Sequence, residues 1–148
     1  GGDLAAHVLL ACPRPVLIVP YIQRETVVGK RILVAWNGSV QAARALSAAL
    51  PFLRRAERVT VAAFRPADEP AADPDLLPYL KRHGIEAALL GESPGLSGGE
   101  PLLSLLADQA ADMLVMGAYG RPHLSELLLG GVTRTVLESM TVPVLMAH

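Results

Sequence analysis

Short, continuous apolar runs alternate with segments of helical periodicity along residues 30–148. The clearest run is Arg31-Ile32-Leu33-Val34-Ala35-Trp36, and the turn residues Asn37-Gly38-Ser39 separate it from a segment with apolar residues at helical spacing. Runs of this kind are typical of strands that are covered on both faces. Alternation of such strands with helices predicts an α/β fold: a doubly wound, five-stranded parallel sheet with helices on both faces.

The same reading places the individual elements. Ser39 is a suitable N-cap for the first helix after the strand, and Gly84 is a suitable stop for a later one. A proline-rich loop is expected over 65–74, and a loop rich in Gly, Ser and Pro over 91–99. Strands are predicted over 31–36, 59–64, 85–90, 113–117 and 142–147, and helices over 42–53, 75–83, 100–110 and 132–140.

A glycine pattern follows the fourth of these strands. It reads Gly117-Ala118-Tyr119-Gly120, then nine residues, then Gly130-Gly131-Val132-Thr133 at the start of a helix. Glycine lets backbone approach a phosphate closely, and the unpaired N–H groups of a helix start point toward negative charge. The pattern matches neither of the common phosphate-binding signatures. It nevertheless has the parts of an anion cradle.

Topology predicts a partner for that loop. In doubly wound sheets, ligands bind outside the carboxyl ends of the strands, where the strand order reverses. The strands over 31–36 and 113–117 are expected to flank this point. Asn37-Gly38 and the segment from Gly117 to Gly120 should therefore lie together.

Composition narrows the class of protein. The length of 148 residues suits one domain, and Lys and Arg are scattered at a net charge of −1, which argues against a nucleic-acid partner. No apolar run reaches the roughly 18 residues of a membrane span. The single cysteine, Cys12, excludes an internal disulfide, and no secretory signal is visible, so a cytoplasmic location is expected.

No catalytic or metal-binding set is visible. The histidines lack metal-ligand spacing, and neither Ser39 nor Ser125 stands in a nucleophile elbow. Nothing resembles a paired general acid and base. The residues alone therefore predict no catalytic site. The histidines are His7, His83, His123 and His148.

Residues 1–20 repeat the end of the chain. With a shift of 128 residues, Val8-Leu9 matches Val136-Leu137, and Pro15-Val16-Leu17 matches Pro143-Val144-Leu145. The simplest interpretation is that 1–20 are the C-terminal helix–strand tail of a preceding domain of the same fold, in a truncated chain. Residues 21–29 would then be a linker and 30–148 a complete domain. The alternative is a chance match between two helix–strand units.

This repeat carries a structural prediction. A lone helix and strand cannot bury their own apolar faces. The strand over 16–19 should therefore pair with a sheet edge, either the last strand of its own chain or that of a second copy.

The motifs now described resemble those of the universal stress protein family. They are Ile32 to Ser39, Gly117-x-x-Gly120-x9-Gly130, and Val142-Pro143-Val144-Leu145 as a closing strand. The similarity covers 30–148, and 1–20 look like the end of a preceding family domain. The resemblance implies an adenine nucleotide alpha hydrolase-like fold and a role in stress response. It also implies a homodimer, or two domains of one chain, paired through the last strand.

The resemblance further implies a site for ATP, possibly with Mg²⁺, and at most slow ATP hydrolysis. Two departures bear on it: Asn37 stands where the family has Asp, and Gly131 stands where it has Ser or Thr. A hydroxyl bond to a charged phosphate is worth about 1–3 kcal/mol, so the site would be weakened rather than lost. The candidate nucleotide-binding residues are Ala35, Trp36, Asn37, Ala63, Met116, Gly117, Gly120, Gly130, Gly131, Val132 and Thr133.

Several alternatives stay open at this point. Gly117 and Gly120 either cradle phosphate or only permit a tight exit from the strand. Trp36 either covers a base, fills a gap in the core or blocks the pocket. At the level of function, nucleotide binding stands against a dimerisation or adaptor module without nucleotide, and against a transfer module of another doubly wound family.

Overall fold

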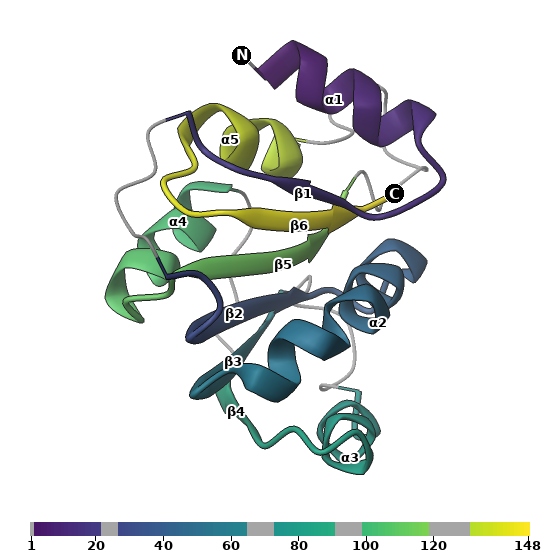
Figure 1. The fold of residues 1–148 in the computed structure, drawn as a ribbon, viewed down its shortest axis with the longest axis vertical. Helices are drawn as coiled ribbons and strands as arrows, with labels where there is room; N and C mark the ends of the chain where they lie inside the picture. Colours follow the sequence, from purple (N-terminus) through teal and green to yellow (C-terminus); the bar gives the residue numbers. More distant parts are fainter. Residues whose placement is uncertain (1, 22–26, 65–72, 91–98, 119–130) are drawn as a thin grey trace.

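A computed structural model describes residues 2–21, 27–64, 73–90, 99–118 and 131–148 (Figure 1). Gly120 and Gly130, the loop over 65–72 and most of the loop over 91–99 lie outside these residues. The helices are α1 (Gly2–Ala11), α2 (Val40–Arg55), α3 (Leu76–Arg82), α4 (Gly99–Asp108) and α5 (Gly131–Ser139). The strands are β1 (Val16–Ile18), β2 (Arg31–Trp36), β3 (Arg58–Ala63), β4 (Ala87–Leu90), β5 (Met113–Gly117) and β6 (Val144–Ala147).

The strands form one mixed sheet in the order β1-β6-β5-β2-β3-β4. The five strands from β2 to β6 pair in parallel, which confirms the predicted α/β class and the parallel core of the sheet. The sheet has six strands rather than five, because β1 adds an antiparallel strand at the β6 edge.

Alternating side chains of the strands build two core layers. Ile32 and Val34 pack on the side of the sheet that α2 and α3 cover. Leu33 and Ala35 pack on the opposite side, with residues of α4, α5 and α1. Figure 1 shows the two groups of helices on opposite sides of the sheet. The helices therefore divide the molecule into an α2/α3 side and an α4/α5 side.

The pairing of β1 with β6 joins equivalent positions of the internal repeat. Leu17 lies opposite Leu145, which is its own match under the shift of 128 residues. The neighbouring pairs are reciprocal, since Val16 lies opposite Met146 and Ile18 lies opposite Val144. This is the pattern of an isologous contact about a local two-fold axis. The predicted strand therefore pairs with the last strand of its own chain, and it ends at Ile18.

The helices of the repeat follow the same arrangement. Helix α1 packs against α5, which is its equivalent under the shift. Leu9 of α1 is buried, in the same apolar cluster as Val136 of α5. The first helix and strand of the chain are thus anchored on the last helix and strand.

A buried carboxylate fixes the start of β2. Asp112, just before β5, accepts the backbone N–H groups of Gly29 at 2.9 Å and Lys30 at 3.0 Å through its two carboxylate oxygens. It also accepts the N–H of Arg31, at 3.2 Å to each oxygen. These bonds lie at the amino ends of the strands, away from the predicted site. The sequence analysis did not single out Asp112.

Candidate functional site

The strand order reverses between β2 and β5. These strands are direct neighbours, with Ile32 opposite Met113 and Val34 opposite Val115. From β2 the chain continues to β3 on one side, whereas from β5 it continues to β6 on the other. The carboxyl ends of β2 and β5 are therefore adjacent, as predicted, and they bring the turn after Trp36 close to Gly117.

A set of hydrogen bonds fixes the turn after β2. Asn37 Oδ1 accepts the backbone N–H of Ser39 at 3.1 Å and the Ser39 hydroxyl at 2.6 Å. Ser39 Oγ in turn accepts the N–H of Ala42 at 3.0 Å, which confirms Ser39 as the N-cap of α2. A backbone N–H can only donate, so the Asn37 oxygen must be the atom that faces it. The side-chain oxygen of Asn37 is thus used within the turn. Its NH₂ group takes no part in these hydrogen bonds.

Gly117 has no room for a side chain. A Cβ built there would lie 2.5 Å from Ala42 N and 2.7 Å from Gln41 C, because the first turn of α2 packs on the end of β5. Both atoms belong to the backbone and cannot rotate away. Glycine at this position is therefore required for packing, independently of any ligand.

Helix α5 begins at Gly131, the first residue of the glycine pattern after Ala118 that the structure describes. A Cβ built on Gly131 would meet nothing within 4 Å. Thr135 Oγ1 donates to Gly131 O at 2.9 Å, on the same turn of the helix. Thr133 is only 2% exposed, so its side chain lies in the interior rather than on the open surface of the helix start. Among the described residues, none crowds the Cβ position of Gly131 in the first turn of α5.

The sheet separates the candidate residues into two groups. Ala35, Met116 and Val132 belong to the apolar cluster on the α4/α5 side. Trp36 belongs to the cluster on the α2/α3 side, and it lines a cavity there together with Ala63. Within the described residues, these candidates therefore belong to two different core clusters, one on each side of the sheet.

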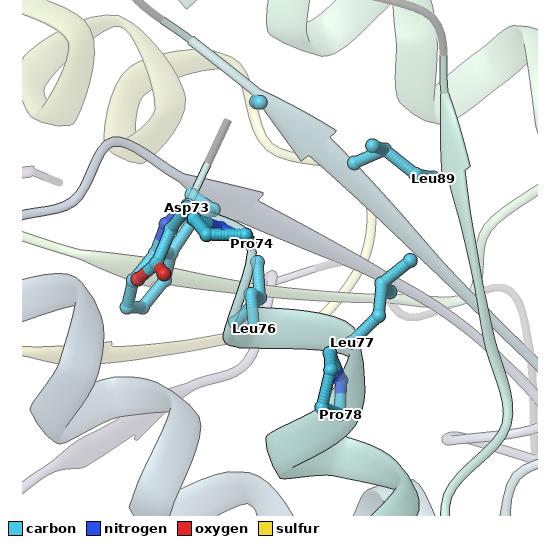
Figure 2. A pocket seen from close by; sticks show the side chains of 8 residues that line it. Asp73, Pro74, Leu76, Leu77, Pro78 and Leu89 are labelled. Carbon is cyan, nitrogen blue, oxygen red and sulfur yellow. The ribbon is translucent and has the colours of Figure 1, made fainter. Parts of the chain in front are cut away.

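The cavity has a volume of about 230 Å³ and lies at the carboxyl ends of β2 and β3, next to α3. Figure 2 shows Leu76, Leu77 and Pro78 rising from α3 and Leu89 facing them from β4. Among the described residues, the lining consists of Trp36, Ala63, Asp73, Pro74, Leu76, Leu77, Pro78 and Leu89. Sequence reasoning singled out Trp36 and Ala63, but periodicity could not show that α3 closes over them.

In the part of the chain that the structure describes, no three His, Cys, Asp or Glu side chains gather into a metal site. None of the described helices has the length and apolarity needed to cross a membrane.

Comparisons with known proteins agree with this architecture. Residues 95–148 match the model of the Universal stress protein family. Universal stress protein MJ0577 of Methanocaldococcus jannaschii is 37% identical over 46 residues, which are 31% of this chain and 28% of that protein. The region that matches the family model, residues 95–148, includes β5, the glycine pattern, α5 and β6.

Two solved structures show the likeness of fold. A universal stress protein from Archaeoglobus fulgidus has a TM-score of 0.65 at 21% identity, over 90% of this chain and 49% of that chain. A universal stress protein in complex with cAMP has a TM-score of 0.52 at 22% identity, over 80% of this chain and 96% of that chain. The chain thus spans about half the length of the Archaeoglobus protein. Residues 95–148 carry the sequence pattern of the universal stress protein family, in a chain that shares the fold of solved universal stress proteins.

Proposed function

We propose that residues 30–148 form a universal stress protein domain that binds ATP or a related adenine nucleotide and acts in stress response in the cytoplasm. The observation that carries this proposal is the adjacency of the β2 and β5 ends, with α5 beginning at Gly131 after the glycine pattern. The family match over 95–148 and the similar protein that was solved with cAMP support it.

In this proposal, the backbone does most of the binding. The first N–H groups of an α-helix have no partner within the helix, so we propose that the backbone of the first turn of α5, at Gly131 and Val132, receives a phosphate, with Mg²⁺ where the nucleotide carries it. Asn37 acts as a donor through its NH₂ group, since its oxygen is occupied by Ser39. Ala35 and Met116 supply apolar contact on the α4/α5 side.

Isothermal titration with MgATP tests the proposal, with AMP as the ligand that lacks the outer phosphates. We expect micromolar binding. Gly131→Ser should bind MgATP roughly tenfold more tightly, because a hydroxyl bond to phosphate of about 1.4 kcal/mol corresponds to a factor of ten. A side chain fits at this position without steric conflict. Gly131→Ala is the matched control, since it adds the Cβ without the hydroxyl and should leave the affinity close to that of the wild type.

Gly120→Val should abolish binding, because it places a branched side chain in the loop that holds the phosphates. Absence of heat from a folded wild-type protein, together with no response to Gly131→Ser, would contradict nucleotide binding.

A second candidate function is a dimerisation or adaptor module that binds no nucleotide. Two observations favour it specifically. Packing alone accounts for Gly117, and Asn37 uses its acceptor within its own turn. The titration described above separates the two functions.

We also propose that residues 1–20 are the helix–strand tail of a preceding domain of the same fold, and that 21–29 are a linker. Leu4 and Val8 of α1 and Leu17 of β1 are exposed, whereas their equivalents Val132, Val136 and Leu145 are half-buried or buried in the core. The exposed apolar side chains of this tail are therefore those that the core of a complete preceding domain would bury.

A further inference from the structure

His148 ties the end of β6 to the end of β5. Ala118, the residue after β5, donates its backbone N–H to Ala147 O at 2.8 Å. Its own carbonyl oxygen lies 3.3 Å from His148 Nδ1. A carbonyl oxygen can only accept a hydrogen bond, so Nδ1 must carry a proton in this contact. Both main-chain polar groups of Ala118 are therefore bonded, one to Ala147 and one to His148.

Helix α2 in turn holds His148. Arg44 Nη1 donates to the main-chain oxygen of His148 at 3.0 Å. The first turn of the same helix packs against Gly117, where a Cβ would lie 2.5 Å from Ala42 N. Strand pairing places Gly117 opposite Ala147, and Figure 1 shows β5 and β6 ending next to each other. Helix α2 and the end of β6 thus fix the end of β5 together.

The hydrogen bond to Ala118 controls the backbone at the start of the glycine pattern. A peptide group is planar, so a fixed carbonyl oxygen fixes the direction in which the chain leaves β5. Ala118 is 0% exposed, and a buried carbonyl that loses its donor is costly. Ala118 directly follows Met116 and Gly117, which are candidate nucleotide contacts. The His148 ring therefore acts on the end of β5 without belonging to the candidate set itself.

We propose that His148 is a positioning residue for the nucleotide site, because it fixes the backbone at the end of β5 by donating to Ala118 O. This inference rests on the nucleotide binding proposed above. A ligand that meets a backbone already fixed in place loses less conformational freedom on binding, and it therefore binds more tightly. Arg44 supports the contact, since it holds the main chain that carries the His148 ring.

Calorimetric titration with MgATP tests this role. His148→Leu removes the donor and should weaken MgATP binding about three- to tenfold, the range expected for one hydrogen bond. His148→Asn should bind MgATP nearly as the wild type does, because its amide NH₂ can donate to the same carbonyl. A general loss of stability would not produce this pattern, since nearly all of the protein stays folded and its affinity for MgATP stays the same.

A double-mutant cycle tests the part of Arg44. Arg44→Met should weaken MgATP binding less than His148→Leu does. The double variant should bind no more weakly than His148→Leu alone, because Arg44 acts through His148. Arg55→Met, at an exposed position at the opposite end of α2, is the matched control and should bind as the wild type does. Additive losses in the double variant would overturn the support assigned to Arg44.

A measurement without nucleotide keeps this proposal apart from the proposed function. Long-range proton–nitrogen NMR in mildly alkaline buffer should show the His148 ring as the Nδ1–H tautomer, assigned by its loss in His148→Asn. The Nε2–H tautomer would overturn the proposal whatever MgATP does. Unchanged affinity in His148→Leu would also overturn it and would leave the proposed function in place. A wild type that binds no MgATP would overturn the proposed function, and this role with it.

Discussion

At the scale of single residues, two glycines of one sequence pattern have different reasons to be glycine. Gly117 is enclosed by the backbone of Gln41 and Ala42, whereas no described residue lies within 4 Å of a Cβ built on Gly131. The sequence alone could not separate these cases, because the neighbours of Gly117 come from a helix more than 70 residues earlier in the chain. Packing thus requires the first glycine and leaves the second free for a ligand to use.

Gly117→Ala should lower the free energy of unfolding by about 1–3 kcal/mol, the usual cost of overpacking, because the new Cβ meets backbone that cannot rotate away. Urea denaturation followed by circular dichroism measures the change. Gly131→Ala is the matched control and should cost less than about 0.5 kcal/mol, as for other open surface positions. Equal costs for the two variants would mean that α2 does not hold its position against β5.

At the scale of elements, the predicted bounds were most accurate for strands whose sequence is a continuous apolar run. The strands over 31–36 and 113–117 were predicted with the observed bounds. The strand over 85–90 was predicted to begin too early. Ile85 donates to Leu80 O at 2.9 Å and Gly84 to Lys81 O at 3.0 Å, so the chain is still closing α3 there. Gly84 has a φ of +78°, as expected of the glycine that stops a helix.

The last strand was also predicted to begin too early. Val144 is its first residue, and Pro143, which precedes it, has no N–H to donate. For the candidate site, the adjacency of β2 and β5 was predictable from the alternation of elements. The division of the candidate residues between two sides of the sheet was not, since it depends on which helix covers each strand end.

Asp112 joins the start of β2 to β5, and its loss should be costly. Asp112→Ala leaves the N–H groups of Gly29, Lys30 and Arg31 without their acceptor, and we expect a loss of about 2–3 kcal/mol in the free energy of unfolding. Denaturation in urea measures it. Asp108→Ala, at an exposed position at the end of α4, is the control and should change stability little. If Asp112→Ala lowered the free energy of unfolding no more than the control does, the hydrogen bonds of this carboxylate would not stabilise the start of β2.

At the scale of the whole molecule, the exposed apolar side chains of α1 and β1 predict self-association when the chain is studied alone. Leu4 is 73% exposed and Leu17 is 42% exposed, on elements whose equivalents lie in a core. Light scattering after size-exclusion chromatography should show association that grows with protein concentration. The double variant Leu4→Glu, Leu17→Lys should remain monomeric.

The control for this prediction is Val40→Glu, since Val40 is 61% exposed on a different element, α2. It should associate as the wild type does. A wild-type chain that is monomeric at every concentration would show that the α1 and β1 face needs no cover.

The antiparallel contact of β1 with β6 also determines how easily a strand from a second molecule can pair with β6. The strand that covers β6 is joined to the same chain, and a short connection gives a tethered segment an effective concentration on the order of millimolar. A strand from a second molecule must compete with that local supply, which dilution does not reduce. Dilution therefore favours β1 over a strand of another molecule at the β6 edge. A second molecule can displace β1 only at protein concentrations close to this effective concentration.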